Sequence, residues 1–178
     1  KMDYSQFFNM IPEAGLMAIL VIVFLADLFL KGEKKHATLS MLTCALLVAQ
    51  VVLCFNAQPA EAFAGLYTAT AAAQVMKVIL TAGAYIVVVM AQSWIEREDV
   101  LRKEGEFYEL VTSTLLGMYM MISSGHFLMF FLGLEMASVP MACLVAFDKY
   151  KKESAEGAAK FVLTATFSSG VMLYGISF

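Results

Sequence analysis

Glu135 is the residue in this sequence whose type and position point most clearly to chemistry. It lies near the middle of an otherwise uncharged stretch, His126 to Phe147, that is long enough to cross a bilayer as a helix. A carboxylate at that depth costs about 2.5–3.5 kcal/mol on insertion scales. Ionisable groups at membrane depth mark ion or proton pathways by default, so Glu135 is a candidate proton carrier.

The residues after Glu135 suit proton transfer. Pro140 has no N–H group, so the carbonyl of Met136 loses its helical partner one residue from the carboxylate. Ser138 adds a hydroxyl nearby. We therefore predict a loosened, hydrated turn beside Glu135. The alternative is a structural glutamate, which is held protonated by burial or ties helices together through a hydrogen bond.

Lys160 is the second candidate for a proton relay. With Thr164 and Ser168 it recurs every four residues, which predicts a polar stripe along one helix face. Lys160 is also close to the start of its apolar segment, so its ammonium could instead snorkel to the interface. Glu156 offers it an i,i+4 partner there. The residues alone leave both interpretations open.

Other ionisable residues lie near the ends of apolar segments. For Lys77 and Asp27 we expect interfacial snorkelling or local pairing, since Asp27 precedes Lys31 by four residues. Three further residues border segments, and we expect them to face headgroups or water: Glu13, Glu106 and His126.

The elements that carry these residues are predicted to be membrane helices. The 178 residues are 61% hydrophobic and only 15% charged, well outside the soluble range, with a mean hydropathy of +0.76. The sequence therefore predicts an all-α, polytopic membrane helix bundle of about six transmembrane helices, because isolated strands would leave backbone groups unpaired in lipid. The expected segments are Ile11–Leu30, Ala37–Phe55, Val75–Ile95, Phe107–Ser123, His126–Phe147 and Gly157–Phe178.

The loops predict how the bundle is oriented. Most of the 12 basic residues lie in the first, third and fifth connections, so the positive-inside rule places the N-terminus outside. Residues 58–74 contain Pro59 and Gly65 and are expected to form an outer loop or an interfacial helix. Because Phe178 ends the last apolar run without a polar anchor, we expect the chain to be part of a longer protein.

Several function classes have no support in the sequence. No basic aromatic surface indicates nucleic-acid binding, and no phosphate loop, catalytic triad or haem-binding histidine pair is present. The cysteines lack paired spacing, so no metal or disulfide framework is expected, and they are interpreted as packing residues: Cys44, Cys54 and Cys143. Small residues are expected to allow close helix packing: Gly117, Gly133, Ala137 and Gly170.

Four motifs resemble the antiporter-like subunits of respiratory complex I. They are GEFYELV (105–111), LGMYMMISS (116–124), FLGLEMASVP (131–140) and SAEGAAKFVLTATFSSGVMLYG (154–175). The GEFY opening and the FLGLE-x-x-S-x-P form are similar to the N-type subunit. L- and M-type subunits and sodium/proton antiporters tend to have tryptophan where this chain has Leu134. The resemblance runs from about Gly105 to the end.

The resemblance implies a fold and two site residues. It implies an N-terminal three-helix region over residues 2–104 and the start of an inverted-repeat proton-translocation domain over residues 105–178. Glu135 corresponds to the family's fifth-helix glutamate, whose partner is a lysine on the seventh helix, and Lys160 corresponds to a sixth-helix lysine. The pair would move protons as the lysine changes its pKa with the distance of its carboxylate.

The resemblance also implies where the redox chemistry takes place. This chain would hold no cofactor, and NADH, FMN, iron–sulfur clusters and quinone would belong to partner subunits of NADH:quinone oxidoreductase. Its partners would be the lipid bilayer of the cell inner membrane and neighbouring antiporter-like and small helical subunits, with no nucleic acid. Two alternatives stay open: a subunit of a monovalent cation/proton antiporter, and a structural membrane subunit without its own proton path.

Overall fold

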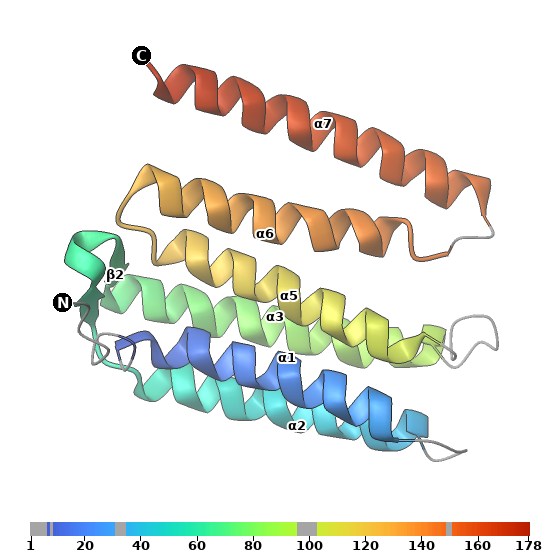
Figure 1. Cartoon of the computed structure of the whole chain (residues 1–178). Helices are drawn as coiled ribbons and strands as arrows, with labels where there is room; N and C mark the ends of the chain where they lie inside the picture. Colours follow the sequence, from blue (N-terminus) through green and yellow to red (C-terminus); the bar gives the residue numbers. More distant parts are fainter. Residues whose placement is uncertain (1–6, 8, 31–34, 96–102, 149–150) are drawn as a thin grey trace.

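The chain folds into long helices that lie side by side (Figure 1). The computed structural model describes residues 7, 9–30, 35–95, 103–148 and 151–178. Within these residues the six predicted helical segments are confirmed, with ends that differ by a few residues. The helices are α1 (Ile11–Phe29), α2 (Lys35–Asn56), α3 (Ala71–Ile95), α5 (Glu104–Ile122), α6 (Phe127–Val145) and α7 (Lys152–Ile176).

Helix α5 differs from the other five in composition and in position. In the described part of the chain, every α-helix except α5 is long and apolar enough to cross a membrane by length and composition. Helix α5 begins with Glu104 and Glu106, and it packs against α1, α3 and α6. Because other helices surround it, α5 can bury polar side chains such as Tyr108 and Thr112 against protein rather than lipid.

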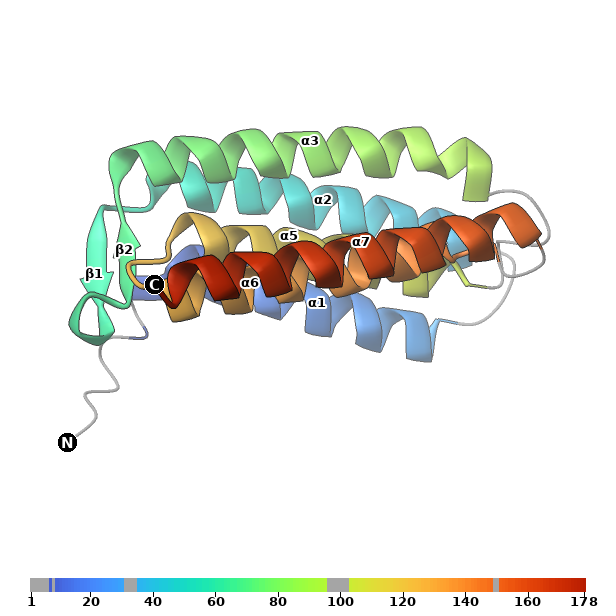
Figure 2. The same cartoon turned by 90° about the horizontal axis from the view of Figure 1, so that it is seen from above.

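The segment between α2 and α3 lies outside the membrane-length helices, as expected for a loop, but it is a small β-hairpin rather than an interfacial helix. The last residues of the range 58–74 belong to α3. Strand β1 (Ala60–Ala62) pairs antiparallel with β2 (Tyr67–Ala69), and the short 3-10 turn η2 (Phe63–Gly65) joins them. The hairpin lies at one end of the bundle (Figure 2). We call this end the hairpin end and the opposite one the basic end.

Backbone hydrogen bonds attach the hairpin to the turn between α5 and α6. The Thr68 amide donates to the Ser123 carbonyl over 2.9 Å, and the Gly125 amide donates to the Leu66 carbonyl over 2.8 Å. Gly125 packs so tightly against the hairpin that an added Cβ would lie 1.9 Å from the Gly65 carbonyl oxygen. The hairpin therefore fixes the position of the turn from which α6 starts.

Helices α5 and α6 approach each other most closely where both carry small residues. A Cβ on Gly117 would lie 2.4 Å from the backbone nitrogen of Ala137, and one on Gly133 would lie 2.7 Å from that of Met121. The predicted packing role is confirmed for these small residues. It is wrong for Gly170 on α7, where a Cβ would meet no described atom within 4 Å.

Helix α7 lies at the edge of the bundle, along α6 (Figure 1). Its buried residues are Ala158 and Ser169, which mark the face turned to α6. Large apolar side chains elsewhere on the helix are exposed, including Leu163 at 71% and Phe167 at 76%. Such a surface suits contact with lipid tails or with other apolar helices.

Candidate functional site

Glu135 has no charged or hydrogen-bonded partner within the described residues. It is partly buried in α6, which continues as one helix through Pro140. The Ser138 hydroxyl donates to the Leu134 carbonyl over 2.7 Å and does not reach the carboxylate. Glu135 is therefore an uncommitted carboxylate inside a membrane-length helix.

Lys160 is paired on its own helix. Its Nζ donates to Glu156 Oε1 over 2.5 Å, and the two side chains are 74% and 65% exposed. Thr164 and Ser168 are also exposed, so the predicted polar stripe follows the open side of α7. The structure records no contact between Lys160 and Glu135, and the lysine adopts the i,i+4 pairing with Glu156.

A second glutamate–lysine pair lies at the hairpin end. Lys77 was expected to snorkel or to pair locally, and Glu13 was expected to face headgroups or water. Instead their side chains are 0% and 4% exposed, and Lys77 Nζ donates to Glu13 Oε1 over 2.6 Å. The pair joins α1 to α3. Glu13 also lies in the first turn of α1, where the helix dipole stabilises its negative charge.

Two hydroxyl groups complete the environment of this carboxylate. Tyr67 of β2 donates to Glu13 Oε2 over 2.9 Å, and Ser123 donates to Oε1 over 3.1 Å. Burial, followed by the nearby charge of Glu13, raises the pKa of the Tyr67 phenol, which therefore stays protonated as a donor. Lys77 Nζ also lies 5.4 Å from the centre of the Tyr67 ring. Three donors thus converge on one buried carboxylate.

A second polar layer lies one turn deeper in the bundle. The Tyr119 hydroxyl is 3.0 Å from Cys54 Sγ and forms a short hydrogen bond with the Thr81 hydroxyl. Gln50 Nε2 donates to the Pro12 carbonyl over 2.7 Å. Four helices and the hairpin therefore share one buried polar cluster, which we call the Glu13–Lys77 cluster.

The sequence contained one signal for this cluster. Glu13 lies two residues after the start of the first predicted segment, and Lys77 lies two residues after the start of the third. Both segments run in the same direction in the predicted topology, so the two opposite charges lie at the same depth. Residues of opposite sign at equal depth are candidates for pairing.

Ion pairs also lie at the basic end. Asp27 pairs with Lys35 over 2.8 Å, which confirms local pairing for Asp27, whereas the expected partner Lys31 lies outside the described residues. His36 Nδ1 lies 2.5 Å from Oε2 of Glu104, whose side chain is 2% exposed. These contacts join α1 to α2 and α2 to α5.

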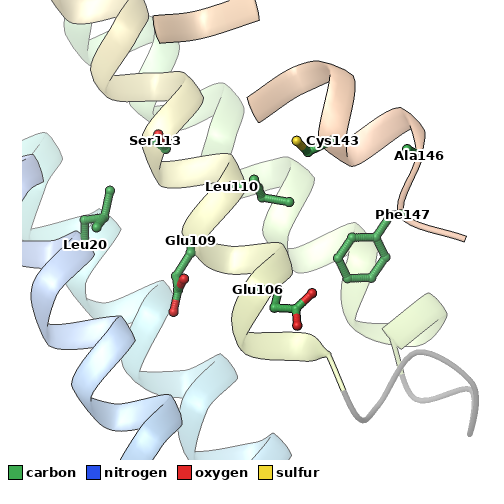
Figure 3. Close-up of a pocket in the computed structure, with 8 residues that line it drawn as sticks. All are labelled: Leu20, Glu106, Glu109, Leu110, Ser113, Cys143, Ala146 and Phe147. Carbon is green, nitrogen blue, oxygen red and sulfur yellow. The ribbon is translucent and has the colours of Figure 1, made fainter. Parts of the chain in front are cut away.

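A cavity of about 520 Å³ opens between α1, α5 and α6 (Figure 3). Glu106 and Glu109 line it from α5, together with apolar side chains such as Leu20 and Phe147. Glu106 is exposed at the basic end of the bundle, and His126 is exposed at the hairpin end. Both agree with their predicted places at segment borders. The cavity is acidic, but no cluster of three metal-binding side chains occurs in the described ranges.

The three cysteines are free thiols in different environments. Cys54 is buried, Cys44 is partly buried and Cys143 is exposed. Cys54 and Cys44 both accept hydrogen bonds from glutamine amides, from Gln50 over 3.7 Å and from Gln92 over 3.6 Å. The packing role expected for them fits the two more buried thiols.

Known relatives align with almost the whole chain, whereas the family match covers its C-terminal part. The family described as "NADH:quinone oxidoreductase/Mrp antiporter, TM" matches residues 124–178, which hold both Glu135 and Lys160. NADH-quinone oxidoreductase subunit N of Phocaeicola vulgatus is 52% identical over 99% of this chain, and its counterpart in Azobacteroides pseudotrichonymphae is 41% identical over 99%. That of Neisseria gonorrhoeae is 32% identical over 94%. The chain spans 37% of the length of the first two relatives.

Proposed function

We propose that this chain, which belongs to the family of antiporter-like N-type subunits of NADH-quinone oxidoreductase, contributes Glu135 to proton translocation across a membrane. The observation that carries the proposal is the uncommitted carboxylate in α6. A charged group at membrane depth without a partner is costly. It therefore lowers its free energy by taking up a proton or by approaching a cation from another helix.

Lys160 is the second member of the proposed relay. Its ammonium donates to Glu156 across one helical turn. In the proposed relay, Lys160 exchanges this partner for another carboxylate. Since both side chains of the pair are largely exposed, little packing has to be broken for the contact to open.

The proposal extends to the assembly in which the chain works. In this assembly, the chain is a non-redox part of an oxidoreductase complex in the bacterial inner membrane. NADH oxidation and quinone reduction take place in partner subunits. Its own role is to couple quinone reduction to proton movement. The basic end faces the cytoplasm, in keeping with the positive-inside rule.

The test uses the full-length subunit in its assembled, membrane-embedded complex. Glu135→Gln keeps the size of the side chain and removes the titratable carboxylate. We expect fewer protons to be moved per NADH oxidised, with quinone reduction still taking place. The matched control is Glu61→Gln, which removes the same charge from the exposed face of β1. An unchanged proton yield in Glu135→Gln would mean that the carboxylate has only a structural role.

A monovalent cation/proton antiporter is the second candidate, because the matching family description includes antiporters. Leu134 before the glutamate and the GEFY motif favour the oxidoreductase subunit. The two candidate functions are distinguished by measuring, in sealed vesicles, which driving force supports transport. Transport that follows NADH oxidation supports the first, and transport that follows an imposed pH gradient without NADH supports the second.

A further inference from the structure

An apolar groove of about 500 Å³ runs along α5, between α3 and α6. We call it the α5 groove. Both flanking helices pack against α5, whereas they contact each other only sparsely. Thr114 and Leu115 of α5 form the floor and are 5% and 0% exposed. Exposed apolar side chains form the rims, among them Ile79, Val87 and Met141. The groove therefore opens toward the surroundings of the bundle.

Gly83 deepens the groove on the α3 side. Ile79, Gly83 and Val87 are spaced by four residues, so they share one face of the helix. A Cβ on Gly83 would meet no described atom within 4 Å. Glycine inside a helix costs about 0.5–1 kcal/mol relative to alanine, and packing among the described residues does not require it here. The missing side chain leaves a notch between two exposed apolar ones.

The lining of the groove has no polar side chain left over for a ligand among the described residues. Thr114 carries a hydroxyl, but it donates to the Leu110 carbonyl over 2.9 Å on its own helix. The other lining side chains are apolar. A polar ligand would give up hydrogen bonds elsewhere without gaining new ones from these side chains. The α5 groove therefore fits a hydrocarbon.

The length of the groove matches one leaflet of a bilayer. Its lining on α5 runs from Phe107 to Met118, which corresponds to about 16 Å of helix. Half of a typical hydrocarbon core is about 15 Å. At the basic end the groove begins beside Trp94, whose ring lies 6.1 Å from that of Phe107. Tryptophan is enriched at headgroup level, so the groove extends from that level to the middle of the membrane.

The groove is too narrow to hold another helix. Its volume, spread over its length, gives a mean cross-section of about 30–40 Å². A helix with its side chains is about 10–12 Å across, which corresponds to a cross-section of about 80–110 Å². A single hydrocarbon chain carries no side chains and is much thinner. The width, like the length, therefore favours a lipid tail over a protein segment.

We propose that the α5 groove binds one acyl chain of a phospholipid from the leaflet at the basic end. The acyl chain lies against Leu115 and fills the notch at Gly83, and its headgroup stays at the level of Trp94. Because lipid tails are as apolar as leucine, close packing holds the acyl chain in place. It bridges α3 and α6, which make few direct contacts. The proposal does not depend on proton transport by Glu135.

The test is photo-crosslinking in the full-length subunit within its assembled complex, reconstituted in nanodiscs that contain a phospholipid with a diazirine on one acyl chain. Mass spectrometry locates the labelled residues, and we expect them to include the floor residues Thr114 and Leu115. In Gly83→Leu the new side chain fills the notch. Labelling of the floor should then fall about 3- to 10-fold, because the displaced chain loses its contacts there.

The matched control is Gly170→Leu on α7, where an added Cβ also meets open space but does not line the groove. It should keep the labelling of the wild type. If Gly83→Leu does not assemble into the complex, Gly83→Val and Gly170→Val repeat the comparison with a smaller side chain.

Three outcomes would overturn the proposal. The first is an unlabelled floor in the wild type, which would mean that a protein segment covers the groove. The second is equal labelling of the floor in the Gly83 variant and its Gly170 control. The third is a loss of floor labelling when a quinone with a long isoprenoid tail is added to the nanodiscs, since this would assign the groove to the quinone tail.

Discussion

The two glutamate–lysine pairs of this protein are built in opposite ways. Glu13 and Lys77 lie 64 positions apart in the sequence and meet in the interior, with side chains 4% and 0% exposed. Glu156 and Lys160 are one helical turn apart on α7 and largely exposed. The first pair holds separate helices together, whereas the second connects one helix only to itself.

The difference divides the molecule into a part whose buried charges have fixed partners and a part whose ionisable side chains do not. Around α1, α2, α3 and α5 the buried charges have partners, and the hairpin is bonded to them. Along α6 and α7, Glu135 has no partner in the described structure. Lys160 pairs with Glu156, and this exposed contact can be broken at a small cost in free energy. Charges that must change partners in a transport cycle are better placed in the second part, which is where the proposed relay lies.

Removing the buried cation should have the largest effect on this comparison. Lys77→Met leaves Glu13 without its counter-charge, and breaking a buried pair in this way costs about 3–5 kcal/mol of stability. Denaturant unfolding of the purified full-length protein in detergent measures the loss. A free energy of unfolding equal to that of the wild type would show that the ion pair does not hold the helices together.

The hairpin contact should come next. Tyr67→Phe removes the hydroxyl that donates to Glu13 and should cost about 1.5–3 kcal/mol, the range for a hydrogen bond to a charged group. Tyr174→Phe on α7 removes a hydroxyl from a 68% exposed side chain and serves as the matched control. Equal stability changes in the two variants would contradict the distinction between the two parts.

The close approach of α5 and α6 gives a third contrast. Gly117→Ala places a methyl group against the backbone of Ala137 and should cost about 1–3 kcal/mol through overpacking. Gly170→Ala meets open space and should be neutral or stabilising by about 0.5–1 kcal/mol, since alanine favours the helix. Thermal unfolding compares the two, and a harmless Gly117→Ala would refute the tight contact.

The smallest effect is expected for Lys160. Exposed pairs of this kind contribute about 0.5 kcal/mol or less, so Lys160→Met should unfold almost as the wild type does. If Lys160 belongs to the proposed relay, the same variant should still lower the number of protons moved per NADH oxidised. A large loss of stability would instead place Lys160 with the structural charges.

The helices could be predicted from the sequence because each apolar run is long enough to span a bilayer. The start of α5 was less accurate, since acidic residues were taken to lie outside the segment. Glu104 is in fact buried and held by His36 of α2. The hairpin escaped prediction because strands of three residues are too short to show an alternating pattern.

The Glu13–Lys77 cluster escaped prediction for a different reason. A charge near the end of an apolar run ordinarily reaches water, and neither Glu13 nor Lys77 carries a local sign of burial. Their burial depends on the hairpin, which covers the end of the bundle with Tyr67. For Glu135, by contrast, depth alone marks the residue, because the middle of a membrane span is far from bulk water.

The turn between α5 and α6 bears on how the protein enters the membrane during synthesis. Residues 123–126 are two serines, a glycine and a histidine, so they carry no fixed charge. A connection without charge crosses a bilayer at lower cost than a charged one, which allows α5 and α6 to insert together as one helical hairpin. By then α1 and α3 have already been made. Glu13 and Lys77 can therefore meet first, and Ser123 joins their cluster when the later pair of helices arrives.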